Sequence, residues 1–125
     1  MAITHPTTIR NQLADLVVDA LDAGAGAGTL EFQLGNGTEV ATCTFGDPAF
    51  GAAASATATA NAITDDTSAT GNASAVAQFE AKDSDGNVVF SGSVGTSGED
   101  INLSSVTIGS GDTLSITSLT YTAPP

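Results

Sequence analysis

The sequence has almost no positive charge. Its 125 residues include two lysine or arginine residues against fourteen aspartates and glutamates, which gives a net charge of -12. Nucleic-acid binding depends on cations that displace counterions from phosphates, and anionic membrane surfaces attract polybasic segments. The composition therefore argues against a nucleic-acid or membrane partner and leaves a positively charged protein surface as a plausible one.

Residues that carry chemistry are also scarce, because Cys43 and His5 are the single representatives of their types. One cysteine excludes an internal disulfide and offers no metal-ligand spacing. Cys43 lies in an alternating stretch, where a buried small hydrophobe is its expected role. Nucleophilic sites assemble in space and not in sequence. With one histidine and no glycine-rich phosphate loop, however, we expect no enzyme and no cofactor or metal.

Long apolar runs and large side chains are missing as well. No stretch approaches the roughly 20 apolar residues that span a bilayer, and the segment around His5 and Pro6 lacks the apolar run of a signal peptide. We therefore expect synthesis in a cytoplasm without a secretion signal. Tryptophan is absent, and five phenylalanines and one tyrosine supply the aromatic rings. Because alanine buries little surface, neighbours in a homo-oligomer or lattice are expected to add stability.

One helix is predicted over about residues 6–23. Pro6 suits its first turn, and Gly24 suits the left-handed position after its last turn. Apolar residues recur at the spacing of one helical face, and we expect that face to pack on the core: Ile9, Leu13, Leu16, Val17 and Ala20. Polar residues fall on the opposite face: Asn11, Asp15, Asp19 and Asp22.

The charges on this helix oppose its dipole, since Arg10 lies near the start and Asp19 and Asp22 near the end. Asp15 also repels Asp19 at a spacing of four. Charges against local preference are expected where a partner compensates them, so Arg10, Asp15, Asp19 and Asp22 are the predicted partner contacts. Ordinary solvated acids are the alternative. If these residues contact a partner, Arg10→Ala or Asp19→Lys should weaken assembly more than folding.

From Thr29 the apolar period changes to two, which indicates strands. Hairpin turns are predicted at residues 35–37 and 83–87. About seven short strands over residues 29–122 predict a mainly β fold, an antiparallel β-sandwich or small barrel in a single domain over residues 1–125. The expected inner faces comprise Leu30, Phe32 and Leu34, then Ala41, Cys43 and Phe45, and later Ala75, Ala77, Phe79 and Ala81.

Two stretches of this β region carry finer predictions. Alanines alternate with polar residues from Ala54 to Ile63, and a strand with such a small face would let the helix approach closely; a low-complexity loop is the alternative. In the last strand, Leu114 and Ile116 share one parity and Leu119 the other, which predicts a bulge near Thr117 or Ser118.

The acids around residues 83–87 invite a comparison with calcium loops. Asp83, Asp85 and Asn87 cluster oxygen ligands of the kind that calcium prefers. The helical calcium loop, however, has its glycine after the third ligand, whereas Gly86 precedes Asn87. An Asp-Gly turn explains the same residues.

The chain resembles a group of small phage and prophage proteins described as hypothetical or virion structural proteins. The resemblance covers nearly the whole length. It is carried by Met1-Ala2-Ile3-Thr4-His5-Pro6, Leu13-Ala14-Asp15-Leu16-Val17-Val18-Asp19, Gly46-Asp47-Pro48-Ala49-Phe50-Gly51, Lys82-Asp83-Ser84-Asp85-Gly86-Asn87 and Gly111-Asp112-Thr113-Leu114-Ser115-Ile116. It implies a virion component and assigns no catalytic or ligand residue.

Capsid cement or decoration proteins are similar in being small, β-rich and present in many copies. The expected function is therefore a cement protein that bridges major capsid subunits on the outer shell surface, with the major capsid protein and its own copies as partners. A tail or neck protein (tube, terminator or fibre-associated) is the alternative. A carbohydrate-binding module is disfavoured because such modules expose aromatic rings, and a hydrolase is disfavoured by the missing catalytic residues.

Overall fold

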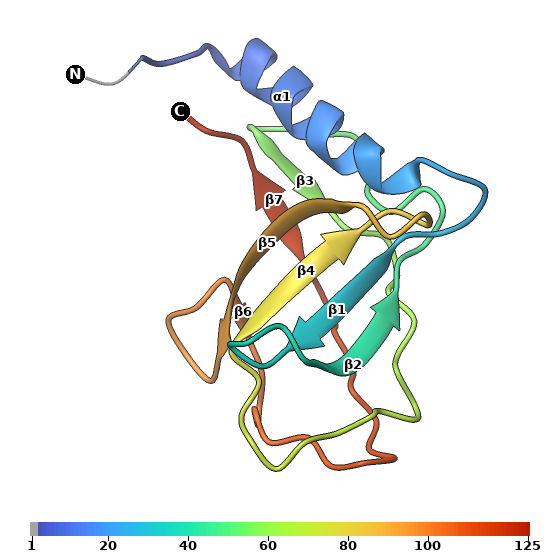
Figure 1. Ribbon diagram of the computed structural model, residues 1–125. Helices are drawn as coiled ribbons and strands as arrows, with labels where there is room; N and C mark the ends of the chain where they lie inside the picture. Colours follow the sequence, from blue (N-terminus) through green and yellow to red (C-terminus); the bar gives the residue numbers. More distant parts are fainter. Residues whose placement is uncertain (1–2) are drawn as a thin grey trace.

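The computed structural model describes residues 3–125. Within that range one helix precedes seven strands, as the sequence predicts (Figure 1). The elements are α1 (Thr7–Asp19), the 3₁₀ turn η1 (Ala20–Asp22), β1 (Thr29–Gln33), β2 (Glu39–Thr44), β3 (Thr57–Thr59), β4 (Gln78–Lys82), β5 (Val88–Gly95), β6 (Ile101–Asn102) and β7 (Thr120–Thr122).

Five strands form a curled sheet in the order β2-β1-β4-β5-β6. Both predicted hairpins are present: β1 pairs antiparallel with β2, and β4 pairs antiparallel with β5. The expectation of a wholly antiparallel fold is wrong at one edge, because β5 and β6 are parallel, with Val94 opposite Ile101. The chain returns from β5 through the loop 96–100 and therefore enters β6 in the same direction.

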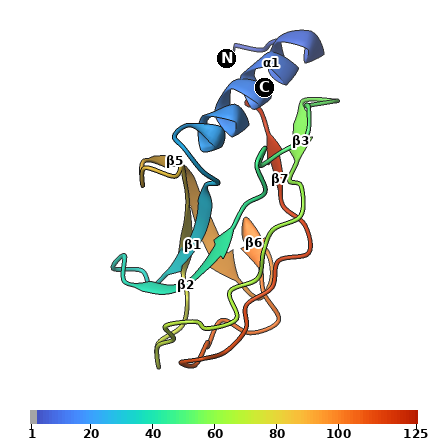
Figure 2. The same cartoon turned by 90° about the vertical axis from the view of Figure 1, so that its right-hand side faces the viewer.

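A second, smaller pair of strands faces this sheet. β3 and β7 are antiparallel, with Ala58 opposite Tyr121. Figure 2 shows the five-stranded sheet on one side and the β3–β7 pair on the other, with α1 across the upper end of both. The core between them is one cluster in which Leu30, Phe32 and Val40 are fully buried.

The alanine-rich segment is mostly not a strand. Only Thr57–Thr59 pairs in a sheet, and Ala58 is its buried residue. The chain reverses just before it, where Ala54 and Thr57 exchange two backbone hydrogen bonds of 3.0 Å. Ala75 and Ala77 are also exposed, so the expected inner face begins only at Phe79. A methyl group contributes too little burial to hold an alternating segment in a sheet.

The last segment is irregular where the parity of its apolar residues changes. Leu114, Ile116 and Leu119 are all buried although they do not share one parity, and regular pairing begins only at Thr120. Residues 115–119 belong to no strand, so the parity changes in an irregular segment, and the prediction of a β-bulge near Thr117 or Ser118 is wrong.

Candidate docking surface on helix α1

Helix α1 is turned half a revolution from the expected orientation. Its buried residues are Ala14 and Val18, with Leu21 following in η1. Leu16, predicted to face the core, keeps 71% of its surface, and Ile9 keeps 39%. The prediction that the most apolar face packs on the β domain is therefore wrong.

The reason lies in the polar side chains that turn inward instead. Asn11 Oδ1 accepts a hydrogen bond from the backbone N–H of Ala56 (2.7 Å), and Asp15 Oδ1 accepts one from Ala53 (2.8 Å). Asp22 Oδ1 accepts another from Ala49 (2.8 Å).

These three bonds, two from α1 and one from η1, attach the helical segment to the irregular segment 49–56. An unpaired buried N–H costs about 1–3 kcal/mol, and this segment forms little regular sheet that would satisfy its donors. Side-chain oxygens from the helix therefore supply the acceptors, and the helix orientation follows from them.

The segment that α1 holds contains a strained turn. Ser55 and Ala56 have φ angles of 52° and 65°, in the left-handed region that residues other than glycine rarely adopt. Such residues persist where the surroundings determine them. The hydrogen bond from Ala56 to Asn11 is one of these restraints.

At the other end of the helix, Arg10 binds the C-terminal tail. Its guanidinium donates from Nε to Pro124 O (3.0 Å) and from Nη2 to Ala123 O (2.9 Å). His5 Nδ1 lies 2.8 Å from Pro125 O. Both ends of the described chain therefore lie side by side near the start of α1 (Figure 1).

An apolar stripe remains on the outside of the helix. We call it the outer stripe, and its members are Ile9, Leu13, Leu16 and Ala20, of which Leu13 is half-buried and the other three are exposed. The spacing of these residues places them on one side of a helix. The opposite side of the helix makes the inward hydrogen bonds to the β domain.

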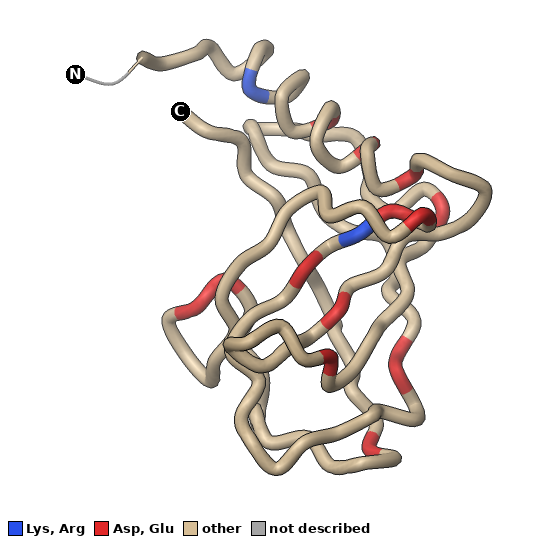
Figure 3. The backbone as a smooth tube through the Cα atoms, viewed as in Figure 1, with Lys and Arg blue, Asp and Glu red and all other residues tan. Residues whose placement is uncertain are grey.

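The charges near this stripe are acidic. Asp19 is exposed beside the outer stripe, and Figure 3 shows further acidic residues gathered around the C-terminal end of α1. Within residues 3–125 both cationic side chains are already bound: Arg10 by the tail carbonyls, and Lys82 by Glu31 at 3.0 Å and Glu80 at 3.6 Å. The surface therefore offers negative charge to a partner.

The four predicted contact residues have different surroundings. Three of them make hydrogen bonds within the chain through their side chains: Arg10, Asp15 and Asp22. Asp19 is exposed. Their role as partner contacts stays a prediction. The outer stripe was visible in the sequence as an apolar face, but nothing in its spacing indicates which way the helix turns.

In the turn 83–87, the side chain of Asp83 binds backbone N–H groups of the same turn. Asp83 Oδ1 accepts hydrogen bonds from the backbone N–H groups of Asp85 and Asn87, both at 2.9 Å. The bond from Asn87 is the main reason that the pKa of Asp83 is lowered. This arrangement is the one expected of an Asp-Gly turn.

Neither a metal cluster nor a membrane-spanning helix occurs in the described range. Among residues 3–125, no three His, Cys, Asp or Glu side chains are grouped closely enough to hold a metal ion. No helix in the same range has the length and apolar character needed to cross a membrane. Burial raises the pKa of the Cys43 thiol, which makes it a poor nucleophile.

Comparisons with known proteins give no match: no family model, no curated protein and no solved structure is similar to this chain.

Proposed function

We propose that this protein is a phage capsid cement protein that docks on the outer surface of the shell through the outer stripe of α1. The observation that carries the proposal is the orientation of the helix. Leu16 is 71% exposed on a helix whose other side is held to the β domain by two side-chain hydrogen bonds, with a third from η1. Burying a leucine side chain contributes about 1.5–3 kcal/mol, so a partner that covers this stripe gains affinity without rearranging the helix.

The charge of the chain supports the outer surface as the location. A net charge of -12 would be repelled by packaged DNA inside the shell, since phosphates attract cations. On the outside the same charge attracts a basic capsid surface and speeds association. The major capsid protein is therefore the proposed partner, and bridging of its neighbouring subunits is the proposed action.

The resemblance to small phage virion proteins supports the same class of function. A binding role also agrees with the polar side chains of the helical segment, because Asn11, Asp15 and Asp22 are engaged in structural hydrogen bonds within the chain. The protein would act by burying surface between capsid subunits.

Quantitative mass spectrometry of purified virions tests the proposal. We expect a copy number equal to that of the major capsid protein, or a simple fraction of it set by a lattice site. A few to some tens of copies would instead move the protein to the tail or neck. Absence from the particle would overturn a virion function altogether.

A further inference from the structure

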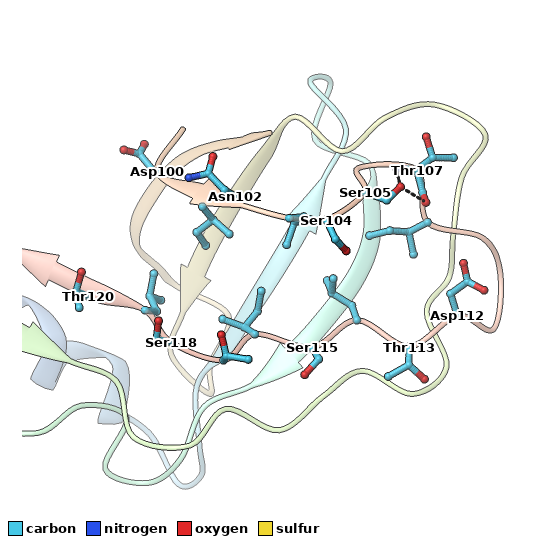
Figure 4. A pocket seen from close by; sticks show the side chains of 17 residues that line it. Asp100, Asn102, Ser104, Ser105, Thr107, Asp112, Thr113, Ser115, Ser118 and Thr120 are labelled. Atoms are coloured by element: carbon cyan, nitrogen blue, oxygen red, sulfur yellow. Dashed lines mark hydrogen bonds between the residues drawn. The ribbon is translucent and has the colours of Figure 1, made fainter. Parts of the chain in front are cut away.

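A groove opens on the molecule away from α1, between two arms of one chain segment. The first arm covers residues 101–108 and the second covers residues 113–120, joined by a turn at Gly109–Asp112 in which Asp112 N–H donates to Gly109 O (3.0 Å). The groove has a volume of about 790 Å³ and is lined by these arms (Figure 4). That volume lies within the range of about 300–1,000 Å³ typical of ligand sites.

Each arm pairs outward, away from the groove. In the first arm, Val106 O and Ile108 O accept hydrogen bonds from Val76 and Asn72. In the second, Leu114 exchanges two hydrogen bonds with Asp66 (3.0 and 2.8 Å). Between residues 3 and 125, no backbone hydrogen bond joins the first arm to the second.

The second arm leaves backbone groups free beside the groove. Leu114 alone pairs with Asp66, and its neighbours Thr113 and Ser115 take no part in that pairing. The N–H groups of Thr113, Ser115 and Thr117 donate no hydrogen bond to any other described residue. Unpaired strand edges are templates for pairing with another chain.

Beneath the polar rim of the groove, the apolar side chains of its floor are thinly covered. Its buried side chains each keep between 5% and 9% of their surface, whereas Leu30 and Phe32 in the main core keep none. These floor residues are Ile101, Leu103, Ile108, Leu114, Ile116 and Leu119. An added strand would cover them with the alternate side chains that it points inward.

The charges of the lining are acidic and few. Asp100 and Asp112 are the charged lining residues, Ser and Thr supply most of the other polar ones, and no aromatic ring contributes. A basic segment is thus complementary to the groove. A second copy of this chain is disfavoured, because each copy carries a net charge of -12.

We propose that this groove binds an extended segment of another protein, which adds as a strand between the two arms. Backbone hydrogen bonds to the free edges provide affinity, as in other cases of strand addition. Apolar side chains of the segment cover the floor, and flanking Lys or Arg residues face Asp100 and Asp112. This site goes beyond the proposed docking by α1, and it does not depend on where in a virion the protein lies.

Nuclear magnetic resonance on the full, isotope-labelled chain tests the proposal with a defined probe, the capped peptide Lys-Val-Thr-Val-Thr-Lys. Six extended residues span about 20 Å. We expect chemical-shift changes confined to residues 101–120 and to the segments that pair with them. The same peptide methylated on alternate backbone nitrogens should bind much more weakly, because it lacks the donors that strand addition needs. Equal binding of the methylated peptide, or shifts elsewhere, would overturn the proposal.

Charge variants provide the second measurement. Asp100→Asn with Asp112→Asn keeps an acceptor oxygen for the internal bonds to Ser93 and Gly109 and removes both charges of the lining. We expect about fivefold weaker binding of the lysine-flanked peptide, because two exposed ion pairs with its flanking lysines are lost. The control, Asp47→Asn with Asp85→Asn, changes the net charge equally and should leave affinity within about twofold.

Two outcomes would contradict the proposed strand addition and leave the proposed function unaffected. An unchanged affinity in the Asp100 and Asp112 variant, relative to its control, would remove the basic segment as the occupant. Self-association of the unmodified chain that the peptide abolishes would show that a second copy fills the groove. Both measurements use the isolated chain, so they are separate from copy number in virions and from shell binding through α1.

Discussion

At the scale of single residues, Asp83 shows how one carboxylate stabilises a turn. It is 7% exposed and accepts hydrogen bonds from the backbone of Asp85 and Asn87. Because the pKa of Asp83 is lowered in the folded chain, its stabilising effect is fully present above the ordinary carboxyl pKa of about 3.9. That effect is lost as the pH falls through the lowered value.

We therefore expect Asp83→Asn to melt at a lower temperature than the unmodified protein at pH 7, with the difference shrinking on acidification below about pH 4. Thermal unfolding followed by circular dichroism between pH 2 and pH 7 would measure this. Asp85→Asn, whose side chain makes no such backbone bonds among residues 3–125, is the matched control. A difference that stays constant over the whole range would contradict the role given to the charge.

Lys82 relieves a like-charge contact on the outer face of the sheet. Glu31 lies directly opposite Glu80 on β1 and β4, and the Lys82 ammonium contacts both, at 3.0 and 3.6 Å. The hydrogen bond with Glu31 raises the pKa of Lys82. This contribution to stability is therefore fully present below the ordinary lysine pKa of about 10.4 and is lost as the pH rises through the raised value.

Removing this cation should expose the repulsion between the two glutamates. We expect Lys82→Met to lower the free energy of unfolding by about 0.5–1 kcal/mol at pH 7, the scale of a cross-strand charge pair. In a Glu80→Gln background the same substitution should cost less, since one of the facing charges is gone. Urea unfolding of the four proteins of this double-mutant cycle measures the coupling, and a cycle without coupling would contradict the account.

At the scale of elements, polar side chains attach α1 to the β domain. We therefore expect Asp15 and Asp19, two acids of the same helix, to contribute differently to stability. Asp15→Ala leaves the N–H of Ala53 without its acceptor and should lower the free energy of unfolding by about 1–2 kcal/mol. Asp19→Ala, on the same helix but exposed, should change it by less than about 0.5 kcal/mol. Equal costs for the two variants in urea unfolding would show that Asp15 does not hold the helix.

The helix also shows how far the sequence can specify an element. Its position was predicted closely, because periodicity, Pro6 and Gly24 are local signals, and Gly24 has the expected left-handed φ of 91°. Its orientation was predicted wrongly, because that depends on backbone donors at residues 49–56. Their lack of sheet partners is a tertiary fact that no local pattern records.

The strands also fall into those that local signals predict and those that depend on tertiary structure. Hairpins closed by strong turn residues, β1–β2 and β4–β5, were predicted because Asn-Gly and Asp-Gly turns fix them locally. The structure of the alanine-rich segment was not predicted correctly. Its side chains alternate as in a strand, but they are too small for their burial to hold the segment in a sheet. The parallel pairing of β5 with β6 depends on the path of a loop, which alternation cannot predict.

At the scale of the whole molecule, two surfaces are not covered by any part of residues 3–125. The outer stripe of α1 is apolar and exposed except at the half-buried Leu13, and the groove between residues 101–108 and 113–120 has free backbone donors along its second arm. Neither surface could be predicted from the sequence, although the residues of the stripe, and Leu114, Ile116 and Leu119 of the groove, were recognised as apolar positions. An apolar pattern shows that burial of these side chains is favourable. It does not show whether the same chain or a partner covers them.

The proposed docking predicts a selective loss of binding to the virion shell. Leu16→Gln keeps a helix-forming residue of similar size and leaves the net charge unchanged, so folding should be unaffected. Loss of the buried leucine surface should weaken binding to purified shells at least about tenfold. Val88→Gln, at another apolar residue that is 50% exposed, is the matched control and should bind normally in a cosedimentation assay. Equal binding by both variants would remove the outer stripe from the interface.

Hydroxyl-radical footprinting would show whether a partner covers the outer face of α1. Side-chain oxidation would be measured on the free protein and on the protein bound to virion shells, with Leu16 and Val88 compared in each sample. We expect Leu16, exposed at 71% when free, to become strongly protected on the shell while Val88 stays reactive. Unchanged oxidation of Leu16 on the shell would contradict this prediction.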